Sequence, residues 1–226
     1  MPYIAAGVVK FQNEIFPEKK KLFGELDTGQ EPGTLFITCS DSRIDPNLIT
    51  QTEPGELFIC RNAGNIVPPH SKYTGGMTAS IEYAVAVLNV KHIVICGHTR
   101  CGAMAGALNP DSVKALPHVD DWLSYARAAV QIVNETGKDL NDEDKMNLLV
   151  HENVLLQIQH LKTHPYVAAH LAAGKLDIHG WVYNIKTGEV DSYDEDQKKF
   201  LPVEERYAKQ VALVAAELSE KAGCNH

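Results

Sequence analysis

Two segments of the chain share one pattern, and this pattern constrains the fold more than any other feature. Each segment opens with a short apolar, β-branched run, at residues 34–38 and 92–96, and then breaks into Ser, Gly, Thr and charged residues. Such bounded runs are typical of buried strands. In a parallel sheet, ligands bind outside the carboxyl ends of the strands. The pattern therefore predicts an α/β protein with a binding site where these two strands end.

The two breaks carry side chains that bind metal ions. Cys39 follows the first run, and His98 and Cys101 follow the second. The three-residue spacing of His98 and Cys101 allows a loop or a first helical turn to point both side chains the same way. Two thiolates and an imidazole suit zinc, and they leave one tetrahedral position for water or a carboxylate. We therefore predict a zinc site at Cys39, His98 and Cys101.

Asp41 and Arg43 alternate with serine directly after Cys39. An Asp two residues from a ligand can reach the metal, and an Arg two residues further on can hold that Asp in a bidentate pair. The alternative is an exposed ion pair, which contributes little to stability. The position beside a predicted ligand favours a role in the site.

Composition and charge exclude several classes of protein. The 226 residues suffice for one α/β domain with a substantial core. The net charge of -8 provides no basic surface for nucleic acid, and no apolar run is long enough to span a membrane. The five cysteines do not have the spacing of a disulfide framework, which favours a reducing, cytoplasmic location. We interpret Cys60, Cys96 and Cys224 as small buried apolar side chains.

The order of patterns predicts a single domain over residues 1–226. It has a central, mostly parallel sheet of four strands plus an edge strand, flanked by helices. The strands are expected near residues 34–38, 57–60, 92–96 and 176–185, with a return strand around 190–193. A helical arm at about residues 1–28, interrupted by Pro17, precedes the sheet, and a helix at about 202–222 follows it. Asp45, Asp120 or Asp121, and Asn141 are expected to begin helices.

The motifs closely resemble those of the β-class carbonic anhydrases. The matching segments are Cys39-Ser-Asp41-Ser-Arg43 and Gly97-His98-Thr-Arg-Cys101-Gly102, together with residues 53–65, 80–84 and 179–183. The likeness extends over roughly residues 3–203 and is strongest to the bacterial cyanate-operon and cyanobacterial carboxysomal enzymes. It implies reversible hydration of carbon dioxide to bicarbonate and a proton by hydroxide on zinc. It also implies a homodimer or a dimer-based tetramer, in which the N-terminal helices embrace the neighbouring subunit.

The resemblance implies roles for further residues. Asp41 and Arg43 would form a catalytic dyad, in which Asp41 orients the nucleophile while paired and closes the zinc site when released. Gln30 would hydrogen-bond substrate oxygen, and Gly102 would supply a backbone donor. Phe58 and Tyr83 would form the aromatic wall of the substrate pocket. Ala63 stands where the plant enzymes often have Val, which would widen the apolar wall. Core packing is the alternative for each pocket residue.

Three other functions compete with this interpretation. Carbon disulfide and carbonyl sulfide hydrolases resemble it in scaffold and zinc ligands, and they differ in the substrate route, which motifs do not reveal. A cysteine-nucleophile phosphatase could use Cys39 and Arg43, but that chemistry needs a longer loop of backbone donors and leaves His98 and Cys101 unexplained. A structural zinc protein would need neither Asp41 nor Arg43.

Overall fold

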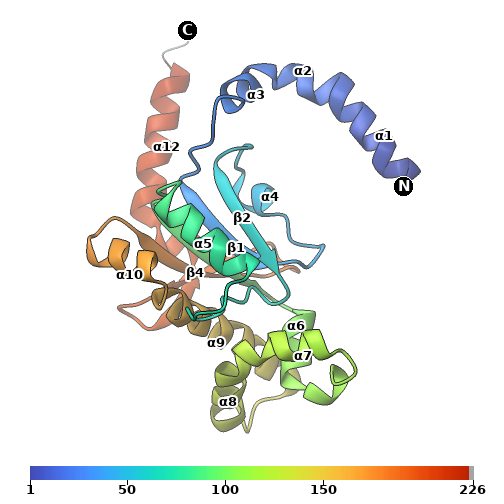
Figure 1. Ribbon diagram of the computed structural model, residues 1–226. Helices are drawn as coiled ribbons and strands as arrows, with labels where there is room; N and C mark the ends of the chain where they lie inside the picture. The colour runs from blue at the N-terminus through green and yellow to red at the C-terminus, as the bar shows by residue number, and fades with distance from the viewer. Residues whose placement is uncertain (224–226) are drawn as a thin grey trace.

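The centre of the structure is a six-stranded sheet (Figure 1). The structure is a computed structural model that describes the backbone of residues 1–223 and side chains as far as residue 215; Cys224 lies outside this range. The strands lie in the order β2-β1-β3-β4-β5-β6. They are β1 (Thr34–Cys39), β2 (Leu57–Asn62), β3 (His92–His98), β4 (Asp177–Tyr183), β5 (Val190–Asp194) and β6 (Lys199–Pro202).

The first four strands are parallel, which confirms the predicted fold class. Leu35, Phe36 and Ile37 of β1 are almost fully buried, because other segments of the same chain cover both faces of the central strands. The return strand is also present, with Tyr183 opposite Val190 across the turn. The sheet has one strand more than predicted: β6 pairs with β5 in a segment to which the sequence analysis assigned no strand, directly before the predicted last helix.

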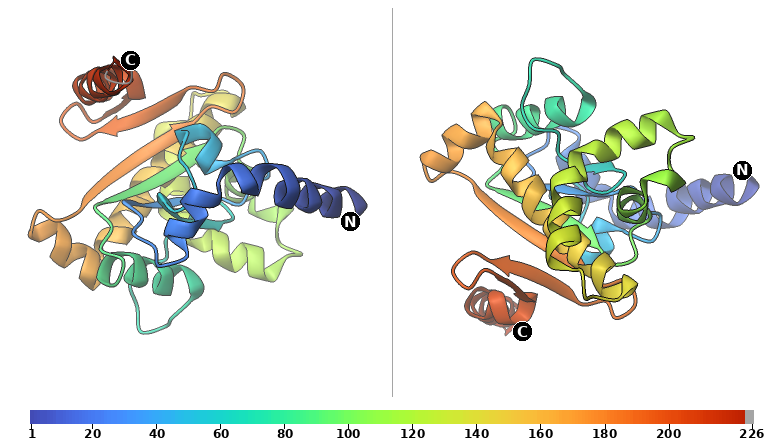
Figure 2. Two further views of the ribbon diagram at one scale, coloured as in Figure 1. Left: turned by 90° about the horizontal axis from the view of Figure 1, so that it is seen from above. Right: turned by 90° about the horizontal axis from the view of Figure 1, so that it is seen from below.

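Helices surround this sheet, and their bounds follow. They are α1 (Pro2–Lys10), α2 (Phe16–Glu18), α3 (Lys20–Leu26), α4 (Pro46–Thr50), α5 (Gly76–Ala86), α6 (Gly102–Leu108), α7 (Pro117–Leu123), α8 (Arg127–Thr136), α9 (Asp142–Lys162), α10 (Pro165–Ala172), α11 (Val203–Arg206) and α12 (Ala208–Gly223), with the π-helical turn η1 (Phe11–Ile15) and the 3-10 turns η2 (Pro110–Ser112) and η3 (Ser124–Ala126). Figure 2 shows α12 beside the β5–β6 edge of the sheet, away from α5 and α10.

The long helix α9 packs directly on β3 and β4. Glycines allow this close approach: a methyl group on Gly97 or Gly180 would lie 2.9 Å from a methyl of Val154. The main core lies between this side of the sheet and its helices, and it includes Ile95 and Leu149. Helix packing on backbone therefore fixes the position of α9 relative to the end of β3.

Local capping follows the sequence at two of the three predicted helix starts. The carboxylate of Asp45 accepts the backbone N–H of Leu48, and the amide oxygen of Asn141 accepts the N–H of Asp144. The predicted helix start at Asp120 is wrong, because α7 already begins at Pro117 and the turn η3 separates it from α8. Proline at the first helical position is the signal that decides this start.

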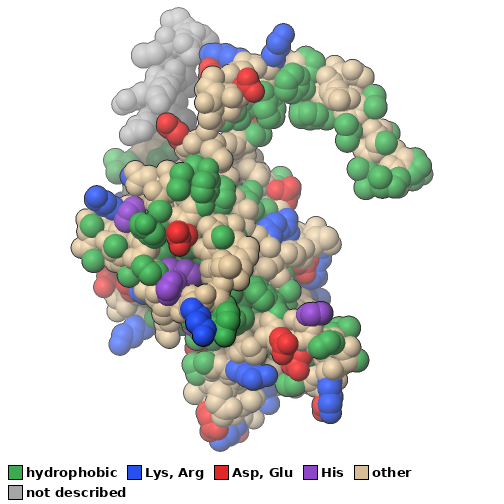
Figure 3. Space-filling model, in the orientation of Figure 1, with side chains coloured by type: hydrophobic (Ala, Val, Ile, Leu, Met, Phe, Trp, Pro, Cys, Tyr) green, Lys and Arg blue, Asp and Glu red, His purple; other side chains and the backbone are tan. Residues whose placement is uncertain are grey.

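The predicted N-terminal helical arm is present, and it extends away from the body of the protein (Figure 1). In the described chain α1, η1, α2 and α3 have no buried residue. Apolar side chains such as Tyr3, Ile4 and Phe11 are exposed along it. Figure 3 shows several patches of apolar side chains on the surface of the arm. None of the helices within residues 1–223 is both long enough and apolar enough to cross a bilayer.

Candidate metal centre

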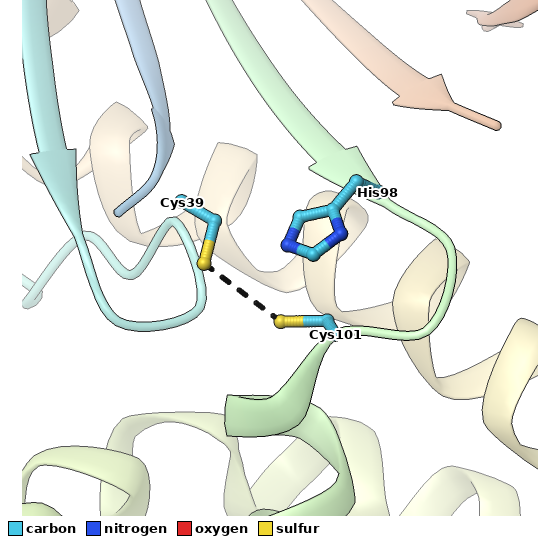
Figure 4. A group of neighbouring side chains, drawn as sticks. All are labelled: Cys39, His98 and Cys101. Carbon is cyan, nitrogen blue, oxygen red and sulfur yellow. Dashed lines mark hydrogen bonds between the residues drawn. The ribbon is translucent and has the colours of Figure 1, made fainter. Parts of the chain in front are cut away.

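Cys39, His98 and Cys101 come together where β1 and β3 end (Figure 4). Cys39 is the last residue of β1, His98 is the last residue of β3, and Cys101 precedes the first turn of α6. Because β1 and β3 are parallel neighbours, their carboxyl ends meet at one edge of the sheet. The three ligand atoms lie within 4.8 Å of one another, and all three residues are buried. The predicted convergence is therefore present in the structure.

The imidazole of His98 is oriented as in a metal ligand. Its Nδ1 lies 2.9 Å from the carbonyl oxygen of Thr99, so Nδ1 carries the proton and donates it. Its Nε2 then presents a lone pair toward the two sulfurs. This buried atom has no hydrogen-bond partner within residues 1–223. An unpaired buried acceptor is costly, and a metal ion at this point would satisfy it.

The two sulfur atoms have the spacing and the electrostatics of a thiolate pair. Cys39 Sγ and Cys101 Sγ lie 3.9 Å apart, close to the roughly 3.8 Å that joins two sulfurs at 2.3 Å from a tetrahedral zinc. The hydrogen bond from Cys101 lowers the pKa of Cys39, and the N–H of Gly64, 3.3 Å from Cys39 Sγ, acts in the same direction. The same hydrogen bond and burial raise the pKa of Cys101. Cys39 and Cys101 therefore share one proton between their sulfur atoms. A divalent metal ion that bound both sulfurs would displace this proton.

Asp41 and Arg43 form the predicted pair beside the cluster. Arg43 Nε donates to Asp41 Oδ1 at 2.9 Å, and Arg43 Nη2 donates to Asp41 Oδ2 at 2.7 Å. Nη2 also donates to the carbonyl of Arg100, on the loop that follows His98. The hydrogen bonds that Arg43 donates to the Asp41 carboxylate hold the pKa of Asp41 well below its usual range. The carboxylate therefore stays charged, with Oδ2 3.9 Å from Nε2 of His98.

Arg61 supports this loop, although it is not among the predicted site residues. Its Nε donates to the carbonyl of Cys39 at 3.0 Å, and its Nη2 donates to the carbonyl of Asp41 at 2.7 Å. Arg61 lies opposite Thr38 in the β1–β2 ladder, so it reaches the end of β1 from the neighbouring strand. A charged residue at a strand end next to the ligand strand is the signal that would have found it.

The five predicted pocket residues fall into two places. Gly102 follows Cys101, and Ala63 precedes the Gly64 amide that contacts Cys39, so both lie at the cluster. Phe58 pairs with Leu35 near the opposite end of β1. At about 3.3 Å per residue it lies on the order of 13 Å from Cys39 along the ladder.

Tyr83 lies with Phe58, and Gln30 lies before the start of β1, so neither is at the metal cluster. The rings of Phe58 and Tyr83 are 6.1 Å apart, and Tyr83 is 44% exposed. Gln30 lines a surface hollow together with Leu26 and Leu57, before the start of β1. One chain therefore does not bring Gln30, Phe58 and Tyr83 to Cys39.

The remaining cysteines match the interpretation as apolar side chains. Cys60 and Cys96 are buried free thiols, and burial raises the pKa of Cys96 to about 12. Burial also raises the pKa of Cys60. Both thiols therefore stay protonated near neutral pH, and neither belongs to the metal cluster.

Comparison with known proteins agrees with this geometry. Residues 34–190 match the carbonic anhydrase family. A carbonic anhydrase of Synechococcus elongatus is 48% identical over 84% of this chain and 70% of its own length, and one of Pseudomonas aeruginosa is 46% identical over 89% and 91%. The solved β-carbonic anhydrase CcaA superposes with a TM-score of 0.87 at 44% identity, covering 89% of this chain and 91% of its own. Tetrameric β-carbonic anhydrases of Sordaria macrospora superpose with a TM-score of 0.75 at 32% identity over 84% of this chain and 94% of theirs.

Proposed function

The chain belongs to the β-carbonic anhydrase family and is an enzyme of that family, and we propose that it hydrates carbon dioxide reversibly at a zinc ion held by Cys39, His98 and Cys101. The observation that carries this proposal is the buried, unpaired Nε2 of His98 facing two sulfurs 3.9 Å apart. Zinc bound there would supply a Lewis acid that lowers the pKa of water toward neutrality, to about 7 in carbonic anhydrases that hold zinc with three histidines. The products are bicarbonate and a proton.

The chain's own residues would orient the reactants. We assign to the Asp41 carboxylate the acceptance of a hydrogen bond from the attacking water, since its Oδ2 lies beside the ligand nitrogen of His98. Arg43 holds both oxygens of that carboxylate, which keeps it ionised and pointed at the cluster. Gly102 and Ala63 would line the substrate position next to the ligands. If Asp41 turned away from Arg43, it could occupy the fourth ligand position and stop the reaction.

We propose that the aromatic half of the pocket comes from a second copy of the chain. Phe58 and Tyr83 lie together near the end of β1 opposite to Cys39, and Gln30 precedes the start of β1, so these residues reach a metal cluster only across a subunit interface. The β2 strand is an edge strand, and Ile59 and Tyr83 expose apolar surface beside it. The exposed arm α1–α3 would embrace the same neighbour. A homodimer, or a tetramer of such dimers as in the Sordaria macrospora proteins, follows from this arrangement.

Metal analysis together with an assay of carbon dioxide hydration tests the proposal. The wild-type protein should contain about one zinc per chain, since three of the four tetrahedral ligands come from one chain. Cys39→Ser should lose both zinc and activity, whereas the matched control Cys60→Ser should keep both, because Cys60 lies outside the cluster. A wild-type protein without metal, or a fully active Cys39→Ser variant, would refute the assignment.

The same assay separates the alternative activity. Hydrolysis of carbonyl sulfide or carbon disulfide would leave carbon dioxide hydration undetectable while sulfide is released. No feature of residues 1–223 favours that reaction over hydration. A single domain over residues 1–226 and a cytoplasmic location remain our predictions, and the free thiols at Cys60 and Cys96 support a reducing compartment.

A further inference from the structure

The loop that follows β2, residues 63–67, has a left-handed backbone at the point where its Gly64 N–H contacts the metal cluster. Gly64 has φ +81° and Asn65 has φ +48°, so two successive residues are left-handed. Gly64 is needed here, because a methyl group on it would also lie 2.8 Å from Met104 Cε. Glycine adopts many other backbone conformations as readily, so contacts from the surrounding structure must select this one. The Gly64 N–H that contacts Cys39 Sγ therefore depends on what holds this loop.

Polar side chains of α9 hold residues 63–67 in place by hydrogen bonds. Asn153 and Gln157 are almost fully buried, within the apolar face that α9 packs on the sheet. Asn153 Nδ2 donates to the carbonyl of Gly64 at 3.0 Å. Gln157 Nε2 donates to Asn153 Oδ1 at 2.9 Å, and Gln157 Oε1 accepts the N–H of Val67 at 2.9 Å.

The chain of hydrogen bonds continues one turn further along the helix. His160 Nδ1 donates to the carbonyl of Val67 at 2.9 Å. On the other side of the loop, Trp122 Nε1 donates to the carbonyl of Ala63 at 2.9 Å. Buried polar groups of this kind are costly unless all of them are paired, and here the pairing is with one loop. Asn153 and Gln157 therefore specify the conformation of residues 63–67.

We propose that Asn153 and Gln157 are positioning residues that set the metal affinity of the cluster and the donor strength of the Cys39 sulfur through the Gly64 amide. The inference rests on the proposed zinc site. Neither residue touches the ligands. They fix the carbonyl of Gly64, on the peptide that follows the donor, while Trp122 fixes the carbonyl of Ala63, which shares a peptide plane with the Gly64 N–H. The loop is thus held on both sides of the donor.

The physical effect acts on the sulfur. An N–H that donates to a ligand sulfur withdraws electron density from that sulfur. Two thiolates weaken a bound dication as a Lewis acid, and such a donor offsets part of that loss. Partners of metal ligands typically change metal affinity by about 10–100-fold. Because Asn153 acts through one further hydrogen bond, we expect an effect of about tenfold, at the lower end of that range.

The test compares Asn153→Leu with Val133→Ala in the full-length protein. Leu has the same branched arrangement of side-chain heavy atoms as Asn but cannot donate to Gly64. Val133 is fully buried on α8, so its truncation destabilises the fold without contacting the loop. Zinc affinity is measured by competition with a chromophoric chelator. Cobalt-substituted protein then reports the thiolate directly through its sulfur-to-metal charge-transfer band.

Asn153→Leu should bind zinc about tenfold more weakly than wild type, and its charge-transfer band should move to longer wavelength, because a thiolate without its N–H donor is more easily oxidised. Val133→Ala should lower the unfolding temperature and leave both readouts unchanged. If Asn153→Leu does not fold, Gln157→Met undergoes the same measurements, since it removes the support of Asn153 and Val67.

Wild-type affinity and an unmoved band in the folded variant would overturn the positioning role. Equal weakening by Asn153→Leu and Val133→Ala would also overturn it, since the effect would then reflect stability alone. A wild-type protein that binds no zinc or cobalt would instead refute the proposed metal site, so the two failures are distinguishable.

Discussion

Gly97 connects the packing of α9 to the metal centre, and Gly97→Ala should therefore destabilise the fold measurably. The residue precedes His98 at the end of β3 and lies under α9. A methyl group there would be 2.9 Å from Val154 Cγ2 and 3.2 Å from Val150 Cγ1. Ordinary contacts begin at 3.4 Å, so Val154 would have to retreat by 0.5 Å. Val154 is next to Asn153 in the sequence, so the retreat also disturbs the helix that holds the Gly64 loop.

Two opposing effects give the magnitude. Overpacking a close-packed core by one methyl group costs about 1–3 kcal/mol of unfolding free energy. The φ angle of Gly97 is not in the left-handed region, so Ala also lowers the entropy of the unfolded chain, which stabilises by about 0.4–1 kcal/mol. The net loss is about 1–2 kcal/mol, which lowers the unfolding temperature by about 2–8 °C for a chain of this size.

Urea unfolding followed by circular dichroism measures this loss. The midpoint should fall while the m-value stays constant, as expected for a change in the folded state alone. Gly33→Ala is the matched control, since a methyl group on Gly33 has no other atom within 4 Å. It should leave stability unchanged or raise it by up to about 1 kcal/mol.

A double mutant distinguishes steric pressure from other causes. Val154→Ala removes the methyl group that the new side chain would meet, so Gly97→Ala should cost less in that background. The favourable coupling should be about 0.5–3 kcal/mol. If Gly97→Ala were as stable as Gly33→Ala, or if the two substitutions in the double mutant were additive, the proposed contact between α9 and β3 would not limit stability.

The sequence was sufficient to predict the parallel sheet and the metal cluster because both depend on local signals. A β-branched run followed by a polar break marks the end of a buried strand, and the ligands Cys39 and His98 stand at those breaks. Two such strands need only lie side by side for the ligands to meet. Asp41 and Arg43 are close in sequence, so their bidentate pair is equally local.

The sixth strand and the supports of the loop could not be predicted in the same way. The sheet pairing of β6 depends on β5, and its four residues carry no distinct alternation. Asn153 and Gln157 gave a signal that was not used: they stand in phase with Val150 and Val154 on the apolar face of α9. A polar residue inside an apolar stripe predicts a buried hydrogen bond, but its partner is known only from the fold.

The pocket residues show a different limit. A resemblance assigns Gln30, Phe58 and Tyr83 to a pocket, but it does not say which subunit supplies them. Only the register of β1 and β2 places Phe58 at the opposite end of the strand from Cys39. This register is the observation on which our proposal of a pocket shared between two copies rests.

Three further predictions test the site and the fold. Arg43→Lys should retain zinc yet lose about tenfold or more in kcat/KM, since Lys cannot hold both oxygens of Asp41. If stopped-flow measurements gave an undiminished kcat/KM, the Asp41–Arg43 pair would have no role in the mechanism. Mixing inactive Cys39→Ser subunits with impaired Phe58→Ser subunits should restore activity. A hybrid dimer contains one complete site, in which the zinc of the Phe58→Ser subunit faces the intact Phe58 of the Cys39→Ser subunit. If the mixture gains no activity although mass spectrometry shows hybrids, the pocket is not shared between subunits. Burial lowers the pKa of His164 below its unfolded value of 6.5. At acid pH the unfolded chain therefore binds more protons at this residue than the folded chain does. The contribution of His164 to stability is complete above about pH 6.5 and declines as the pH falls below that value. Urea midpoints measured between pH 5 and 7.5 should therefore decrease toward acid, and less steeply in His164→Gln, whose amide can still donate to the carbonyl of Pro68 that His164 now contacts at 3.0 Å; identical slopes for the two proteins would mean that His164 does not contribute to the acid sensitivity.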